Sequence, residues 1–283
     1  MNPMRQRRFI QCDVFTSVPT KGAGLAVVVD GEGLSDMQMQ TFAVWTNLAE
    51  TTFLLSPTTQ DADYKVRIFT PKRELPFAGF PTLGSCAAWL HVGGKSRKRG
   101  VVKQECGVGI VNIDVSGTVP AFAAPETKIA PMPPATREAI TSALGLPDAC
   151  ILRTSLLANG PVWQVLELAS AADVLAVDPA KLRSAAFPGL GLIGAYPQDS
   201  ECQFETRNLG PNSGTIEDPI TGSLNAAIAY WMYGAGHWCE PVTIAQGTCL
   251  GRQGRLFMRR DDGTGTVWVG GQTWILIDGT LML

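Results

Sequence analysis

Residues 81–88 read PTLGSCAA and residues 219–226 read PITGSLNA, so both stretches fit the pattern P-x-x-G-S-x-x-A. The matching positions are separated by 138 residues, about half of the 283-residue chain. Upstream, the pattern R-x-x-x-P occurs at residues 67–71 and again at residues 207–211, a separation of 140 residues. A period of this length is far longer than that of a solenoid repeat. The sequence therefore predicts two copies of one domain.

The sequence around each copy predicts strands that surround a helix. Residues 64–70 alternate apolar and polar side chains, as a half-buried strand does. Residues 223–233 are apolar on nearly every face, which is typical of a helix buried on all sides, and residues 85–92 are its predicted counterpart. Further strands are expected at residues 101–103, 110–115, 242–244, 255–258 and 266–269. We therefore expect an α+β fold of two pseudo-symmetric domains, each a curved β-sheet or barrel wrapped around a central α-helix.

The boundary between the domains is predicted in residues 120–134, which contain five prolines. Proline interrupts regular backbone hydrogen bonding. The first domain is therefore expected to span residues 1–127 and the second residues 128–283.

One outer helix is expected to begin after Ser35 and to end near Asn47. Ser35 and Gln38 have the spacing of a capping box, and Leu34 and Met39 have that of a hydrophobic staple.

Composition narrows the range of partners and cofactors. The net charge is −2 and the sequence pI is about 5.8, which favours neither nucleic acid nor an anionic membrane as a partner. The chain has seven cysteines, none spaced as C-x-x-C, and two histidines, so we expect no metal site. Free thiols and the lack of an apolar signal core or membrane span indicate a cytoplasmic protein. No phosphate-binding loop or dinucleotide fingerprint is present, so no cofactor is expected.

The repeated turns are candidate binding sites for an anion. Each is expected to enter its buried helix through Gly-Ser, namely Gly84–Ser85 and Gly222–Ser223. A helix N-terminus offers unpaired N–H groups that favour a carboxylate or a developing enolate. The alternative is that the glycines only allow tight turns.

Two carboxylates are candidate acid/base residues. Asp218 precedes the repeated proline of the second copy, where the first copy has Phe80, and an aspartate there is also a common helix cap. The neighbouring Glu217 aligns with Gly79 in this register and is the weaker candidate. Glu50 leads into the apolar stretch of residues 51–55, where desolvation would raise its pKa. The alternative for Glu50 is a solvent-exposed position at a sheet edge.

The chain resembles the PhzF-like family of phenazine-biosynthesis isomerases, within the wider diaminopimelate epimerase-like fold. The resemblance rests on residues 13–22 (DVFTSVPTKG), 45–53 (WTNLAETTF), 67–71 (RIFTP), 75–85 (LPFAGFPTLGS) and 217–223 (EDPITGS). These stretches occur in order along almost the whole chain.

The resemblance implies a homodimer, an active site between the two domains, and isomerisation of a small dihydro-hydroxy-anthranilate acid without metal or organic cofactor. It implies that Glu50 and Asp218 are catalytic and that Ser223 lies in the substrate site. The family's turn glycines match Gly79, Gly84 and Gly222. The family usually has histidine where this chain has Phe80, and we expect Phe80 to pack against an apolar part of the substrate.

These residues predict a cofactor-independent isomerase that moves a proton on a small carboxylic acid. Phe80 leaves open a binding protein with little or no turnover. A racemase or epimerase of another small acid is the third possibility.

Overall fold

The computed structural model describes residues 4–182, 189–210 and 216–283. The chain forms two compact units. Unit 1 comprises Met1–Ala123 and Gly270–Leu283, and unit 2 comprises Ala124–Val269. The division at residues 127 and 128 stays a prediction, but the structure places the last strand with unit 1 and not with the second half of the chain. No described helix is long and apolar enough to cross a lipid bilayer.

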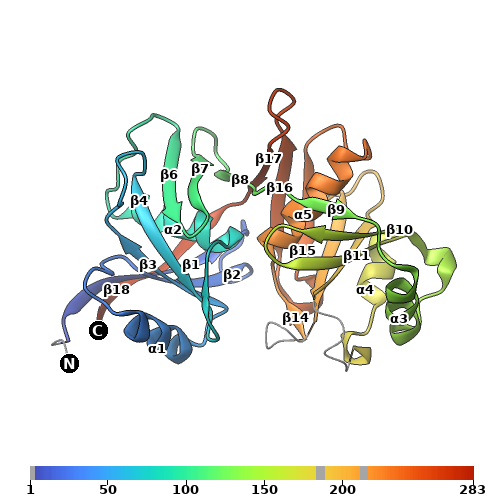
Figure 1. The fold of residues 1–283 in the computed structure, drawn as a ribbon, viewed down its shortest axis with the longest axis horizontal. Helices are drawn as coiled ribbons and strands as arrows, with labels where there is room; N and C mark the ends of the chain where they lie inside the picture. Colours follow the sequence, from blue (N-terminus) through green and yellow to red (C-terminus); the bar gives the residue numbers. More distant parts are fainter. Residues whose placement is uncertain (1–3, 183–188, 211–215) are drawn as a thin grey trace. The chain divides into compact units, whose positions relative to one another are not determined.

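Unit 1 is a sheet that surrounds helix α2 (Figure 1). Its strands pair in the order β18, β1, β2, β3, β4, β6, β7, β8, and only β2–β3 and β4–β6 are parallel. The short β5 pairs with β4. The elements are β1 (Gln6–Val14), β2 (Ala23–Val28), α1 (Asp36–Thr46), β3 (Glu50–Leu55), β4 (Tyr64–Phe69), β5 (Glu74–Leu75), α2 (Gly79–His91), β6 (Val101–Cys106), β7 (Gly109–Asp114), β8 (Ala121–Ala123) and β18 (Thr273–Met282).

Unit 2 has the same plan around helix α5. Its strands pair in the order β9, β10, β11, β12, β13, β15, β16, with β11–β12 and β13–β15 parallel and β14 paired to β13. The elements are β9 (Lys128–Ala130), α3 (Pro134–Leu144), η1 (Asp148–Cys150), β10 (Ile151–Ala158), β11 (Val162–Leu168), α4 (Ala171–Ala176), η2 (Pro179–Lys181), β12 (Leu190–Ala195), β13 (Phe204–Leu209), β14 (Glu217–Asp218), α5 (Gly222–Gly234), β15 (Val242–Gln246), η4 (Thr248–Leu250), β16 (Gly254–Arg260) and β17 (Val267–Gly270).

The two units repeat one topology, which confirms the predicted duplication. The strand order from β1 to β7 and its parallel pairs recur from β10 to β16, and α5 takes the place of α2. The first strand of each copy also gains a distant antiparallel partner, since β18 pairs with β1 and β9 pairs with β10. The predicted fold class of two pseudo-symmetric domains, each a sheet around a helix, is confirmed.

The register of the repeat was wrong. On β4, Ile68 pairs with Leu75, whereas on β13 Asn208 pairs with Asp218, so Leu75 is the counterpart of Asp218. The true separation is 140 residues at these strands and 143 residues from β5 and β14 into the helices, because the connection after β13 is three residues longer. Pro211 of the shorter repeat lies outside the described residues.

The central helix α2 begins six residues earlier than expected, at Gly79, and this explains the error of register. Gly84 and Ser85 lie inside the helix and not at its start. Gly79 is therefore the counterpart of Gly222, the first residue of α5, and Phe80 is the counterpart of Ser223.

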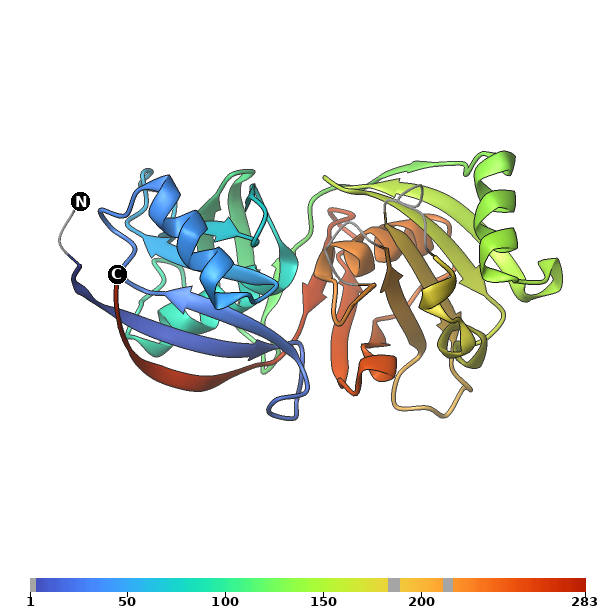
Figure 2. The same cartoon turned by 90° about the horizontal axis from the view of Figure 1, so that it is seen from below.

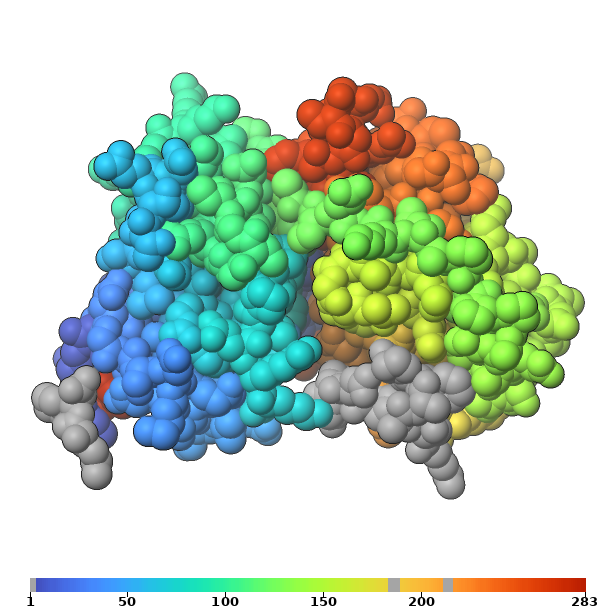
Figure 3. All heavy atoms as spheres, viewed as in Figure 1, coloured from blue at the N-terminus to red at the C-terminus, as the bar shows by residue number. Residues whose placement is uncertain are grey.

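The outer helix α1 forms as predicted. The Ser35 side chain accepts a hydrogen bond from the Gln38 amide, the Gln38 side chain accepts one from the Ser35 amide, and Asn47 ends the helix with φ 53°. Met39 and Leu34 are buried in one cluster with Phe53 of β3. The helix therefore covers the outside of the unit 1 sheet, opposite α2 (Figure 2). In unit 2, helix α3 lies at the surface (Figure 3).

Candidate active site

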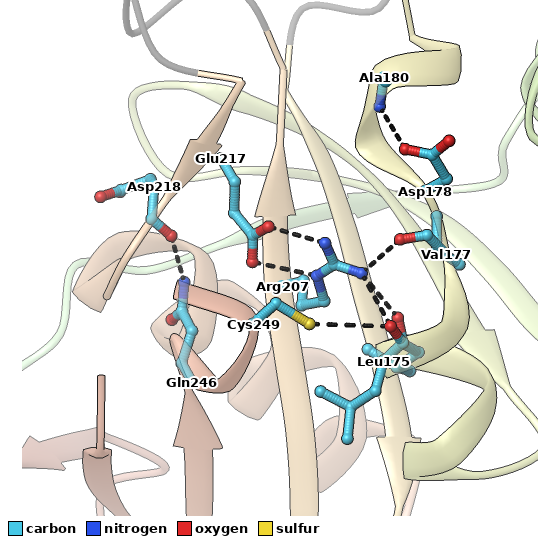
Figure 4. A network of polar contacts seen from close by, with 10 residues as sticks. Leu175, Val177, Asp178, Ala180, Arg207, Glu217, Asp218, Gln246 and Cys249 are labelled. Carbon is cyan, nitrogen blue, oxygen red and sulfur yellow. Dashed lines mark hydrogen bonds and ion pairs between the residues drawn. The ribbon is translucent and has the colours of Figure 1, made fainter. Parts of the chain in front are cut away.

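A buried ion pair holds β14, the short strand that carries Asp218. The Arg207 guanidinium donates from Nε and Nη2 to the two Glu217 carboxylate oxygens, over 3.0 and 2.7 Å. Its Nη1 donates to the carbonyls of Val174 and Val177 at the end of α4, over 3.0 and 2.6 Å (Figure 4). This two-point geometry suits a planar guanidinium and a carboxylate, and it satisfies charges that are cut off from water. Glu217 is therefore buried and structural, and its counterpart in the repeat is Glu74, not Gly79.

Asp218 follows Glu217 and faces the start of α5. Its Oδ2 accepts a hydrogen bond from the Thr221 hydroxyl, over 2.5 Å, and a longer one from the Asn208 amide, over 3.4 Å. Its backbone carbonyl accepts a hydrogen bond from Gln246 Nε2, over 3.3 Å. Asp218 is not the N-cap residue of α5, since Thr221 holds that position.

Burial raises the Asp218 pKa from its usual 3.8 to about 6. Hydrogen bonds from Thr221, Asn208 and the Ile220 amide favour the charged form and hold the pKa down, and the nearby Glu217 charge raises it further. A carboxyl group with a pKa close to neutrality can both accept and donate a proton under physiological conditions. Asp218 thus has the property expected of a general acid or base.

The hydrogen bonds around Asp218 continue through a chain of buried amides. Gln246 Oε1 accepts from the Thr221 backbone amide and from Asn225 Nδ2, over 2.9 and 2.7 Å. Asn225 also accepts from the Thr206 hydroxyl, over 3.0 Å. We call Thr206, Asn208, Thr221, Asn225 and Gln246 the Asp218 network.

The sequence analysis missed this network, although a signal was present. Thr206 and Asn208 alternate with Glu205 and Arg207 on β13, which places two uncharged polar side chains on the face that meets α5. Polar residues on the core face of a strand require buried partners.

Gly222 and Ser223 are the first two residues of α5, as expected. Thr221 does not cap the helix with its side chain, because its hydroxyl is used by Asp218. The Ser223 carbonyl accepts a hydrogen bond from Asn159 Nδ2, over 2.8 Å, which ties the first turn to the loop between β10 and β11. Asp218, Gly222 and Ser223 therefore lie together at one end of α5.

Glu50 is the first residue of β3 and is half-buried. It pairs with Leu25 of the parallel strand β2, while the next residue pairs with β4, so Glu50 is not on an edge strand. Side chains two residues apart share a face of a strand. Thr52 accepts a hydrogen bond from Ser85 of α2, over 2.9 Å, so Glu50 lies on the face that meets the central helix.

Gly79 and Phe80 are the first two residues of α2, and both are buried. Gly84 and Ser85 lie deeper. A Cβ on Gly84 would approach Leu25 Cδ2 to 2.5 Å, and the Ser85 side chain is fully buried. The structure thus places Gly84 and Ser85 in the core between α2 and the sheet, and away from the helix N-terminus where a ligand was expected.

Each unit therefore carries one candidate carboxylate next to its central helix, Glu50 in unit 1 and Asp218 in unit 2. Among the described residues, no group of three or more His, Cys, Asp or Glu side chains is placed to hold a metal ion.

Comparison with known proteins places these features in a family. The family model described as phenazine biosynthesis-like protein matches residues 12–279. The antisense-enhancing sequence 1 protein of Schizosaccharomyces pombe is 35% identical, and the match covers 98% of this chain and 99% of that protein. The trans-2,3-dihydro-3-hydroxyanthranilate isomerase of Pseudomonas aeruginosa is 32% identical, with 90% of each chain covered. A crystal structure of a PhzF-family phenazine biosynthesis protein from Bacillus anthracis superposes with a TM-score of 0.82 over 99% of this chain and all of that chain, at 19% identity.

Proposed function

Because the chain belongs to the phenazine biosynthesis-like protein family, we propose that it is a cofactor-independent isomerase that moves a proton on a small carboxylic acid. The observation that carries this proposal is Asp218, a carboxyl group with a pKa near 6 at the start of a central helix. Glu50 is the second acid/base group. In this proposal the two act from opposite walls of a cleft between the domains, and the enzyme works as a cytoplasmic homodimer.

The proposed reaction needs only proton transfer. The Glu50 carboxylate takes a proton from a carbon of the substrate, and the electron pair of the broken C–H bond delocalises toward the substrate's unsaturated system. Glu50 then returns the proton at another carbon, so a double bond moves and no oxidant or reductant is consumed. Asp218 and Ser223 hold the substrate, and N–H groups at the α5 N-terminus stabilise its negative charge.

Phe80 favours a dihydro-aromatic substrate. It is the second residue of α2 and is buried, and an aromatic ring packs well against another planar ring. The substrate named for the Pseudomonas aeruginosa relative, trans-2,3-dihydro-3-hydroxyanthranilate, is such an acid. It is the first compound to test.

The test is to incubate the protein with trans-2,3-dihydro-3-hydroxyanthranilate and related dihydro-aromatic acids in deuterated water. We expect an isomerised product with one deuterium, little or no product with the Glu50→Gln variant, and normal turnover with Glu138→Gln, an exposed control on α3. If wild type neither converts nor exchanges any of these acids while Phe80→His does, native isomerase activity is refuted.

Phe80 also supports a second candidate, a protein that binds a small acid without turnover. An aromatic side chain can neither donate nor accept the proton that a histidine could move. Tight binding of the acid that is unchanged in Glu50→Gln, with no deuterium exchange in wild type, would favour this role. A product of inverted configuration without double-bond movement would instead identify an epimerase.

A further inference from the structure

The Thr221 hydroxyl has all of its hydrogen-bonding positions assigned by its neighbours. Its oxygen lies 2.9 Å from Asn208 Nδ2, 3.2 Å from Gln246 Nε2 and 2.5 Å from Asp218 Oδ2. A hydroxyl has one proton to donate and two lone pairs that accept. Two amide groups and one carboxylate therefore match it completely.

The backbone fixes which way the Gln246 amide points. Gln246 Oε1 accepts from the Thr221 backbone N–H, which can only donate. The other atom of the amide, Nε2, must then be the group facing the Thr221 hydroxyl, and an NH₂ group can only donate. Asn225 supports the same orientation, because its Nδ2 is fixed by the Thr221 carbonyl and also donates to Gln246 Oε1.

The direction of the Thr221 proton follows from these contacts. Both lone pairs of its oxygen receive amide N–H groups, so the hydroxyl proton must point to Asp218. The Asp218 Oδ2 atom then receives two hydrogen bonds, from Thr221 and from Asn208, which fill its usual acceptor positions.

We infer that Asn208 and Gln246 act through Thr221 as positioning residues, which commit Oδ2 of Asp218 to accepting hydrogen bonds and leave Oδ1 as the oxygen that meets the substrate and exchanges its proton. This inference rests on the proposed function for the role of Oδ1, but the arrangement of hydrogen bonds stands on the geometry alone.

The same position in unit 1 shows what the protein does without this arrangement. The counterparts of Asp218, Thr221 and Asn208 are Leu75, Ala78 and Ile68. The counterpart of Gln246 is Cys106, since Tyr64 pairs with Gln104 as Phe204 pairs with Ile244. The carboxylate and its supporting hydroxyl and amides are therefore present together in one copy and replaced together in the other. This is expected if they form one functional group.

The charged surroundings of Asp218 are simple. Glu217 is the adjacent carboxylate, and its charge is balanced by Arg207. The hydrogen bonds from Thr221 and Asn208 favour the ionised form of Asp218. Loss of the Thr221 hydroxyl should therefore shift the titration of Asp218 upward.

The test is carbon NMR titration of the full-length protein with labelled aspartate carboxyl groups, in which Asp218→Asn identifies the Asp218 signal. We expect Thr221→Val to raise the Asp218 pKa by about one unit, the size expected for one hydrogen bond to a carboxylate, and Thr221→Ser to restore it. Thr82→Val, which removes the hydroxyl that Gln104 donates to in unit 1, is the matched control and should leave the Asp218 titration unchanged.

Gln246→Met should shift the Asp218 pKa in the same direction by less, and Thr221→Val combined with Gln246→Met should shift it no further than Thr221→Val alone. An unchanged pKa in Thr221→Val, or additive shifts in the double variant, would overturn the inference. A role that is only structural would lower thermal stability without this pattern. Because NMR reads Asp218 without turnover, failure of the network and failure of the proposed isomerase are separate results.

Discussion

The stretch β4–β5–α2 of unit 1 and the stretch β13–β14–α5 of unit 2 have the same backbone design and opposite inner faces. In both, an arginine of the longer strand forms a two-point ion pair with a glutamate of the short strand, Arg67 with Glu74 and Arg207 with Glu217. The two copies therefore share the features that hold the short strand in place.

A second shared contact lies between a proline and a glycine. A Cβ on Gly107 would meet Pro76 Cα at 2.6 Å, and a Cβ on Gly247 would meet the Pro219 carbonyl oxygen at 2.6 Å. In both units the strand after the central helix thus passes close to the turn before it.

The inner faces differ in every residue that forms the Asp218 network. Leu75, Ala78 and Ile68 of unit 1 stand where unit 2 has Asp218, Thr221 and Asn208. The comparison separates the residues that build the turn, which both copies keep, from the residues that give one copy its chemistry.

The largest expected effect is on turnover. Asp218→Asn keeps the size of the side chain but removes the titrating oxygen, so the kcat/KM of the proposed isomerase should fall by about 10²- to 10⁴-fold. The matched change in unit 1, Leu75→Asn, should leave the deuterium-exchange assay near the wild-type rate. Equal losses in both variants would mean that Asp218 has no special role in the proposed reaction.

The second prediction compares the two ion pairs by urea denaturation. The Arg207 and Glu217 side chains are 2% and 4% exposed, so Arg207→Met leaves a buried carboxylate without its partner and should cost about 3–5 kcal/mol. The Arg67 and Glu74 side chains are 21% and 42% exposed, so Arg67→Met should cost at most about 1 kcal/mol. Similar losses in the two variants would show that burial does not distinguish the ion pairs.

The third prediction concerns stability and pH. The Asp218 pKa is about 6 in the folded protein, above its usual 3.8, so the folded state binds this proton more tightly than the unfolded state. The resulting stability is fully present below about pH 4 and is lost as the pH rises through 6. Because Asp218 keeps some exposed surface, we expect Asp218→Asn to gain about 2 kcal/mol relative to wild type between pH 4 and pH 7.

The measurement is the difference in unfolding free energy between the two proteins at each pH. Glu205 also has a pKa raised by burial, but it is present in both proteins and its contribution cancels. Leu75→Asn should show a constant difference from wild type across this range. A constant difference for Asp218→Asn as well would contradict the raised pKa.

The sequence was sufficient for the duplicated fold but not for its register. The true shared motif is E-x-P-x-x-G, at residues 74–79 and 217–222. It is displaced from the strand match by three residues because one connection is longer, whereas the pattern with Gly84 and Ser85 matched by coincidence. The place of β18 in unit 1 was also hidden, since strand pairing across the whole chain leaves no local signal.

The candidate site was predictable to the extent that its residues break a local rule. Asp218 and Glu50 stood out as carboxylates beside apolar segments, and both lie next to central helices. Gln246 and Asn208 gave only a weak signal, because their significance depends on meeting Thr221 across three different elements. Whether Glu50 and Asp218 face each other across a cleft stays a prediction.

The smallest expected effect follows from the N-cap positions of the two central helices. Ala78 begins α2 with φ −154° and ψ 143°, the extended conformation of an N-cap residue, but it has no side chain that can bond the first turn. Ser at this position can accept a hydrogen bond from a free helix N–H, so Ala78→Ser should stabilise the protein by about 1 kcal/mol. The gain should appear as a higher midpoint in urea, and Ala78→Val, which adds bulk without an acceptor, should not show it. In unit 2 the equivalent hydroxyl of Thr221 is turned away from the helix toward Asp218, so a gain in Ala78→Ser would measure the capping energy that unit 2 forgoes to orient its carboxylate.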